Sequence, residues 1–110
     1  MRGRKTSNAY RKDADIILVA ARYEEDDKHM AIAQAYQRRW KVWSDVLLLD
    51  RSRLVDELEG GARVFTGCFD DLVADFEVDE EVVLSVWNSE QWITLASKSA
   101  HADDLGLPLF

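Results

Sequence analysis

The stretch "KHMAIAQAYQRRWKVWS", residues 28–44, decides the fold because it fits both a helix and a strand. As a helix, its apolar residues recur at intervals of three and four and form one stripe: Ala33, Tyr36, Trp40, Trp43 and Leu47. The alanine-rich composition also favours a helix. As a strand, alternate residues share one face: Met30, Ile32, Tyr36 and Trp40. The periodicity favours the helix slightly, and both alternatives stay open.

The segment before this stretch predicts a buried strand. Residues 15–23, "DIILVAARY", form a continuous apolar run bounded by charges. A buried strand needs a partner, and the strand alternative for residues 28–44 supplies one through a hairpin. The acids of "EEDD", residues 24–27, predict the solvated turn of that hairpin.

The segment after it predicts a short buried strand and then a helix. Residues 45–50, "DVLLLD", have the strand pattern, and residues 51–59 have the helix pattern. Asp50 is a natural N-cap for the helix. Gly60 can take the left-handed conformation that ends a helix.

The remaining chain predicts three more strands. They span residues 62–69, 82–87 and 92–97, and the last two flank "NSEQ", a four-residue hairpin loop. An acidic connection follows the first of them and carries apolar anchors at Leu72, Val73, Phe76 and Val78. The apolar stretch "LGLPLF", residues 105–110, is expected to dock on the rest of the chain.

These elements predict an α+β fold for residues 13–110, as a single globular domain. The expected architecture is a mostly antiparallel sheet with the short helix covering one side, which is compatible with a partly closed barrel. The sequence contains no motif that identifies a family, and a fold alone does not give a function.

Charge is unevenly placed along the chain. Residues 1–12 carry five cations and no acid, whereas the chain as a whole has a net charge of −7. The favoured interpretation is a flexible basic arm that aids solubility or folds back onto the acidic remainder. The alternative is an arm that binds phosphate, although the acidic remainder would oppose tight binding of a nucleic acid.

Catalytic chemistry has little support in the sequence. The single cysteine, Cys68, excludes an intramolecular disulfide and is expected to be a small core residue. No motif for a nucleophile, a zinc site or a phosphate-binding loop is present. The acidic clusters lack the spacing of a calcium or magnesium loop. We therefore expect no catalytic residue, no metal site and no cofactor, and a protein that is not an enzyme.

The stretch "QRRWKVWSD", residues 37–45, holds the most distinctive group of side chains. Aromatic rings interleaved with cations are typical of surfaces that bind single-stranded nucleic acid. In either secondary structure at least one of the two tryptophans faces the core, so a core edge with a charged rim is the preferred interpretation. The candidate binding residues, including those of the arm, are Arg2, Arg4, Lys5, Arg11, Lys12, Arg38, Arg39, Trp40, Lys41 and Trp43.

The sequence thus favours a non-enzymatic interaction module that acts through a protein partner or through self-association. A sheet edge or the C-terminal segment would form the contact. The alternative is a single-stranded nucleic-acid-binding domain that uses the arm and residues 38–43. The longest apolar run, residues 16–21, is too short to span a bilayer, and the expected location is the cytoplasm.

Overall fold

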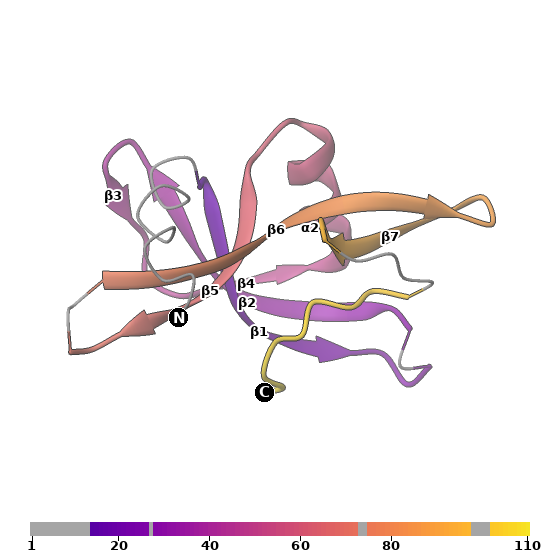
Figure 1. Cartoon of the computed structure of the whole chain (residues 1–110), viewed down its shortest axis with the longest axis horizontal. Helices are drawn as coiled ribbons and strands as arrows, with labels where there is room; N and C mark the ends of the chain where they lie inside the picture. The colour runs from indigo at the N-terminus through magenta and orange to yellow at the C-terminus, as the bar shows by residue number, and fades with distance from the viewer. Residues whose placement is uncertain (1–13, 27, 73–74, 98–101) are drawn as a thin grey trace.

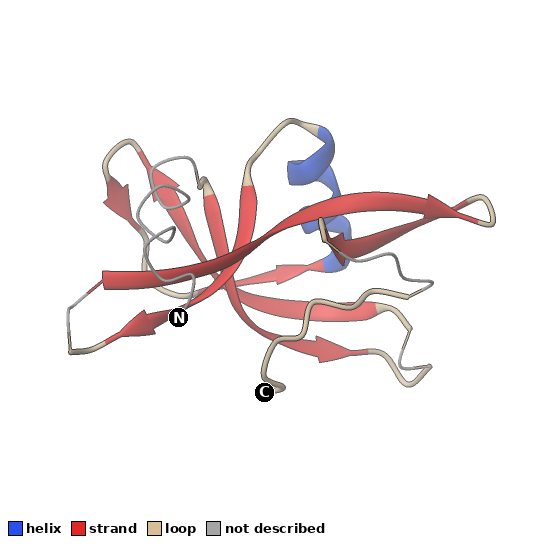
Figure 2. Ribbon diagram, viewed as in Figure 1, coloured by secondary structure: helices blue, strands red, loops and turns tan. Residues whose placement is uncertain are grey.

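One curled sheet dominates the computed structural model, which describes residues 14–26, 28–72, 75–97 and 102–110 (Figures 1 and 2). A single short helix accompanies the sheet in these ranges. The elements in chain order are β1 (Ile16–Tyr23), β2 (Met30–Arg39), β3 (Val42–Trp43), β4 (Leu47–Asp50), α2 (Arg51–Glu59), β5 (Val64–Asp70), β6 (Asp75–Trp87) and β7 (Glu90–Leu95).

The sheet is mixed, so the expectation of a mostly antiparallel sheet is correct only in part. Its strand order is β3-β2-β1-β5-β6-β7, and β4 pairs with β2 on the edge that β3 also occupies. All neighbours are antiparallel except β1 and β5, which run parallel. The parallel pair arises because the chain crosses from β4 through α2 to reach the other side of β1, and such a crossover preserves strand direction.

Residues 30–39 form a strand, so the slight preference for a helix was wrong. β2 pairs with β1 over nearly its whole length. The register skips one residue of β2, Ala31, and this bulge puts Met30 on the same face as Ala33 and Ala35 instead of the face of Ile32. The buried residues are therefore spaced by three and then by two. The helical period of the sequence is coincidental, because Tyr36, Trp40 and Trp43 belong to the two strands and the loop of a hairpin.

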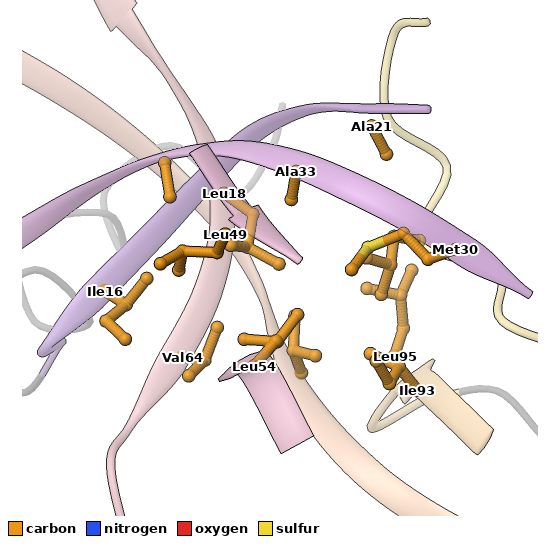
Figure 3. Packing of buried hydrophobic residues seen from close by; sticks show 13 residues of the cluster. Ile16, Leu18, Ala21, Met30, Ala33, Leu49, Leu54, Val64, Ile93 and Leu95 are labelled. Atoms are coloured by element: carbon orange, nitrogen blue, oxygen red, sulfur yellow. The ribbon is translucent and has the colours of Figure 1, made fainter. Parts of the chain in front are cut away.

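The main core lies between the sheet and α2. Figure 3 shows Ile16, Leu18, Leu49 and Val64 gathered around Leu54 of α2, with Met30, Ile93 and Leu95 grouped beside them. A second buried cluster includes Ile17, the neighbour of Ile16 in β1. Its buried members are Ala14, Ile17, Phe65, Phe76 and Val78. Because residues of β1 enter both clusters, both faces of this strand are buried, as its continuous apolar run predicts.

The helix predicted at residues 51–59 is confirmed as α2. Asp50 caps it, and its carboxylate accepts a hydrogen bond of 2.8 Å from the backbone N–H of Arg53. Gly60 keeps a right-handed conformation, whereas Gly61 has a φ of +95°. The left-handed residue thus lies one position later than the sequence indicated.

The C-terminal segment docks on the sheet as expected and contacts both β1 and β7. Leu105 is buried in the main core. The backbone N–H of Ala21 donates to the carbonyl of Pro108 at 2.9 Å, and Asp104 forms a bridge with Thr94 of β7. Parallel pairing of β1 with β5 ends at Leu18, so this segment takes the place that β5 leaves.

Several shorter predictions need correction. β6 begins at Asp75, so the predicted acidic connection is largely strand, and Leu72 is exposed rather than an anchor. The β6–β7 hairpin has a two-residue loop, Asn88 and Ser89, and both have positive φ as a type I′ turn requires. Cys68 is exposed rather than buried, because it lies beyond Thr66, where β5 loses its pairing with β1.

Candidate interaction surface

The β2–β3 hairpin presents a tryptophan to solvent. Arg39 pairs with Val42, so Trp40 and Lys41 form a two-residue loop. Trp40 has a φ of +63°, and 93% of its surface is exposed. A bulky residue rarely adopts this conformation, which a glycine or asparagine takes at lower cost. The fold therefore holds a large apolar ring in water at a backbone cost, a combination that points to a functional position.

Cations flank this ring on both sides. Arg39 and Lys41 are exposed next to Trp40. Arg38 lies further into the strand, where its side chain is 3.7 Å from the carboxylate of Asp15. Arg39 at the end of β2 and the loop residues Trp40 and Lys41 thus form one exposed group. We call this group the basic tip.

Trp43 lies in a different environment. Its ring centroid is 5.1 Å from that of Phe76, which also contacts Tyr36 at 4.9 Å and Phe69 at 5.3 Å. This aromatic cluster joins the β2–β3 hairpin to the β5–β6 hairpin. Of the two tryptophans in "QRRWKVWSD", Trp43 therefore has the expected core position, whereas Trp40 does not.

The edge formed by β3 and β4 is also apolar. Within the described ranges, no further strand pairs with the outer side of β4. Leu48 of β4 is 63% exposed, although the sequence predicted a buried strand, because its side chain lies on the opposite face from that of the buried Leu49. Val42 and Val46 are exposed along the same edge. We call Val42, Val46 and Leu48 the β3–β4 edge.

A concavity lies at the other end of β2, next to the β1–β2 turn. Its volume is about 710 Å³. The residues that line it are Glu24, Glu25, Asp26, His29, Met30, Ala31, Asp50, Arg51 and Ser52. Four of these residues are acids, against one arginine and one histidine, so we call it the acidic concavity.

His29 connects two hairpins at the rim of this concavity. Its Nδ1 lies 2.7 Å from a carboxylate oxygen of Asp26, and its Nε2 lies 2.8 Å from one of Glu90 in β7. Hydrogen bonds to the carboxylates of Glu90 and Asp26 raise the pKa of His29, since only the doubly protonated ring donates to both. The hydrogen bond from His29, aided by two backbone N–H groups, lowers the pKa of Asp26 to about 2. The ring also lies 4.8 Å from that of Trp92.

The buried carboxylate of Asp103 lies behind the concavity and joins β2, α2 and β7 through hydrogen bonds. Its oxygens accept hydrogen bonds from the backbone N–H of Met30 at 2.6 Å and of Ile93 at 2.8 Å. The guanidinium of Arg51 donates to the same carboxylate through Nε at 2.7 Å, and to the carbonyl of Gln91 at 2.7 Å. Arg51 is thus directed inward, and its charge is matched by Asp103, which leaves the acids of the concavity to set the local charge.

Only part of the predicted binding set can be placed in the structure. Arg2, Arg4, Lys5, Arg11 and Lys12 lie outside the described residues. Arg39, Trp40 and Lys41 come together at the basic tip, whereas Arg38 and Trp43 contact other parts of the fold. Sequence reasoning did not assign a role to His29 or Asp103. Their partners lie far away along the chain, so no local pattern marks them.

Comparisons with known proteins leave the geometry to carry the functional argument. No protein-family model matches the chain, and no curated protein or solved structure matches it significantly. In the described part of the chain, no helix is long and apolar enough to cross a membrane. The same part holds no group of three or more histidine, cysteine, aspartate or glutamate side chains placed to bind a metal ion.

Proposed function

We propose that this chain is a non-enzymatic interaction module that binds protein along the β3–β4 edge. The observation that carries the proposal is Trp40, which the fold keeps exposed at a positive φ beside that edge. Tryptophan is among the residues that most often dominate the free energy of a protein interface. A backbone conformation unfavourable to tryptophan is more readily understood if the ring serves binding.

The edge itself supports the same proposal. Natural sheets usually protect an open edge with charges, prolines or bulges. Here the side chains at Val42, Val46 and Leu48 are apolar and exposed instead. An extended partner segment that pairs with β4 would satisfy its open backbone groups and cover these side chains. Trp40 would anchor the end of that segment.

A pair of matched variants tests the proposal. Leu48→Lys puts a charge on the edge, and Val86→Lys puts one on an exposed apolar position of β6, away from the edge. Binding of the full chain to proteins in a cell lysate, and to itself by sedimentation, should be lost in Leu48→Lys and kept in Val86→Lys. The proposal fails if the unmodified chain neither captures a protein above background nor self-associates, or if the two variants behave alike.

One observation favours a second candidate function, the binding of single-stranded nucleic acid. Trp40 offers an open ring between Arg39 and Lys41, which are the groups that a base and its phosphates require. The net charge of −7 opposes it. Fluorescence anisotropy of labelled single-stranded DNA and RNA at two salt concentrations tests it. This candidate is favoured if binding is salt-sensitive, weakens in Trp40→Ala and weakens when the cations of the arm are replaced by Gln. The replaced cations are Arg2, Arg4, Lys5, Arg11 and Lys12. No binding at low salt would eliminate the candidate.

A further inference from the structure

Charge changes sign along the β3–β4 edge. Arg39 pairs with Val42 at one end of β2, where the basic tip lies. Asp50 pairs with Ile32 near the other end of β2, and it lines the acidic concavity together with Glu24 and Glu25. The apolar side chains of Val42, Val46 and Leu48 lie between these two ends. The edge is therefore basic at one end, apolar in the middle and acidic at the other end.

We infer that the partner of this edge is a second copy of the same chain, related to the first by a two-fold axis through the middle of the edge. The inference rests on the proposed function and names its partner. A two-fold axis perpendicular to the strands makes the two edges antiparallel, so the basic tip of each copy meets the acidic concavity of the other. The exposed Leu48 side chains of the two copies then lie on the same face of the joined sheet, close to the axis.

The shape of each end fits this arrangement. The tip is a narrow two-residue loop that projects Trp40 and Lys41, and the concavity is an open hollow of about 710 Å³. Arg51 does not oppose an incoming cation, because Asp103 already balances its charge. Glu24 and Glu25 are both exposed at the hollow and are available to the Lys41 and Arg39 side chains of the second copy.

The antiparallel arrangement is favoured over the parallel one by charge. A parallel arrangement of two edges would place tip beside tip and concavity beside concavity, and like charges in contact are destabilising. The antiparallel arrangement makes the same favourable contact twice. It also closes on itself, so the expected product is a dimer rather than a filament.

Charge-swapped variants of the full chain test the inference in sedimentation experiments. Arg39→Glu with Lys41→Glu makes the tip acidic, and Glu24→Lys with Glu25→Lys makes the concavity basic. Each pair alone places like charges in contact and should raise the dissociation constant of the dimer at least about tenfold. An equimolar mixture should restore the dimer as a heterodimer, because both of its contacts again join opposite charges.

A matched control separates local charge from net charge. Asp71→Lys with Asp79→Lys changes the net charge as much as the concavity variant does, at exposed positions away from the β3–β4 edge. This variant should dimerise like the unmodified chain. Circular dichroism of every variant establishes that each is folded.

Three results would overturn the inference. One is an unmodified chain that stays monomeric up to about 1 mM, a concentration at which even weak dimers form. Another is a mixture of the two folded variants that stays monomeric. The third is a ladder of larger assemblies, which would mean an open head-to-tail contact. If the chain is monomeric but Leu48→Lys still abolishes capture of another protein, the proposed function stands and only the second copy is excluded.

Discussion

The two ends of the sheet join neighbouring hairpins by different chemistry. At one end, which we call the aromatic end, the ring of Phe76 contacts Tyr36, Trp43 and Phe69. At the other, the polar end, His29 joins Asp26 to Glu90, and Asp103 binds backbone amides of β2 and β7. Aromatic contacts depend on shape and burial, whereas the polar contacts depend on protonation and on complete pairing. The ends should therefore respond differently to mutation and to pH.

The largest loss of stability is expected at the polar end, from Asp103→Ala. The change leaves the backbone N–H groups of Met30 and Ile93 without their acceptor and removes the partner of Arg51. Breaking a buried ionic network in this way costs about 3–5 kcal/mol of the free energy of unfolding. Urea denaturation measures it. A loss below about 1 kcal/mol would mean that water replaces the carboxylate and that the polar end is not held by Asp103.

Phe76→Ala tests the aromatic end and should cost slightly less, about 3 kcal/mol. Phe76 is buried and contacts the other three rings, so its removal leaves a cavity between two hairpins. Phe69→Ala is the matched control, because Phe69 touches only the edge of the cluster and is 45% exposed. Urea denaturation of both should give the larger loss for Phe76→Ala. Equal losses would show that Phe76 is not the centre of the cluster.

The pH dependence of stability should come from the polar end. The pKa of His29 is raised above its ordinary value of 6.5, so its contribution is complete below pH 6.5 and is lost as the pH rises through the raised pKa. The pKa of Asp26 falls from 3.8 to about 2, so its contribution is complete above pH 3.8 and is lost as the pH falls toward 2. Both contributions are present only between these limits. They are small because solvent screens both side chains, which are 30% exposed at His29 and 46% exposed at Asp26.

Denaturation midpoints at pH 5.5 and pH 9 check this expectation. The midpoint of the unmodified chain should be lower at pH 9, and His29→Gln should reduce the difference. His101→Gln is the control, since His101 is the other histidine of the chain. A difference that survives His29→Gln unchanged would assign the dependence to other groups.

The smallest effect on stability, and one of opposite sign, is expected from Trp40→Asn. Asparagine accepts a positive φ more readily than tryptophan, and the lost ring has few contacts because it is 93% exposed. The free energy of unfolding should rise by up to about 1 kcal/mol. Dimerisation or partner binding should weaken in the same variant. Stability that falls instead would give the ring a structural role.

Local signals in the sequence predicted the elements that local interactions form. The buried strand β1, the helix capped by Asp50 and the β6–β7 hairpin each depend on neighbouring residues. The sequence left residues 30–39 open between a helix and a strand, because the pairing with β1 and the bulge at Ala31 are not set by neighbouring residues. The exposure of Trp40 follows from the position of a loop that only strand pairing defines.

The polar end lay beyond any local pattern. His29 and Glu90 are 61 positions apart, and Met30 and Asp103 are 73 positions apart. Glu24, Glu25 and Asp26 are exposed as predicted, whereas Asp27 lies outside the described residues. The hollow that the three acids help to line depends on residues from β4 and α2. Sequence reasoning could therefore supply the charges of the candidate site and not their arrangement.

The position of Asp103 in the chain has a consequence for the order of folding. The hydrogen bond between Met30 and Asp103 closes a loop of 73 positions, whereas the rings of the aromatic end lie closer together in the sequence. The entropy cost of closing a loop rises with its length. We therefore expect the contacts of the Asp103 carboxylate to form late in folding, after those of the aromatic end.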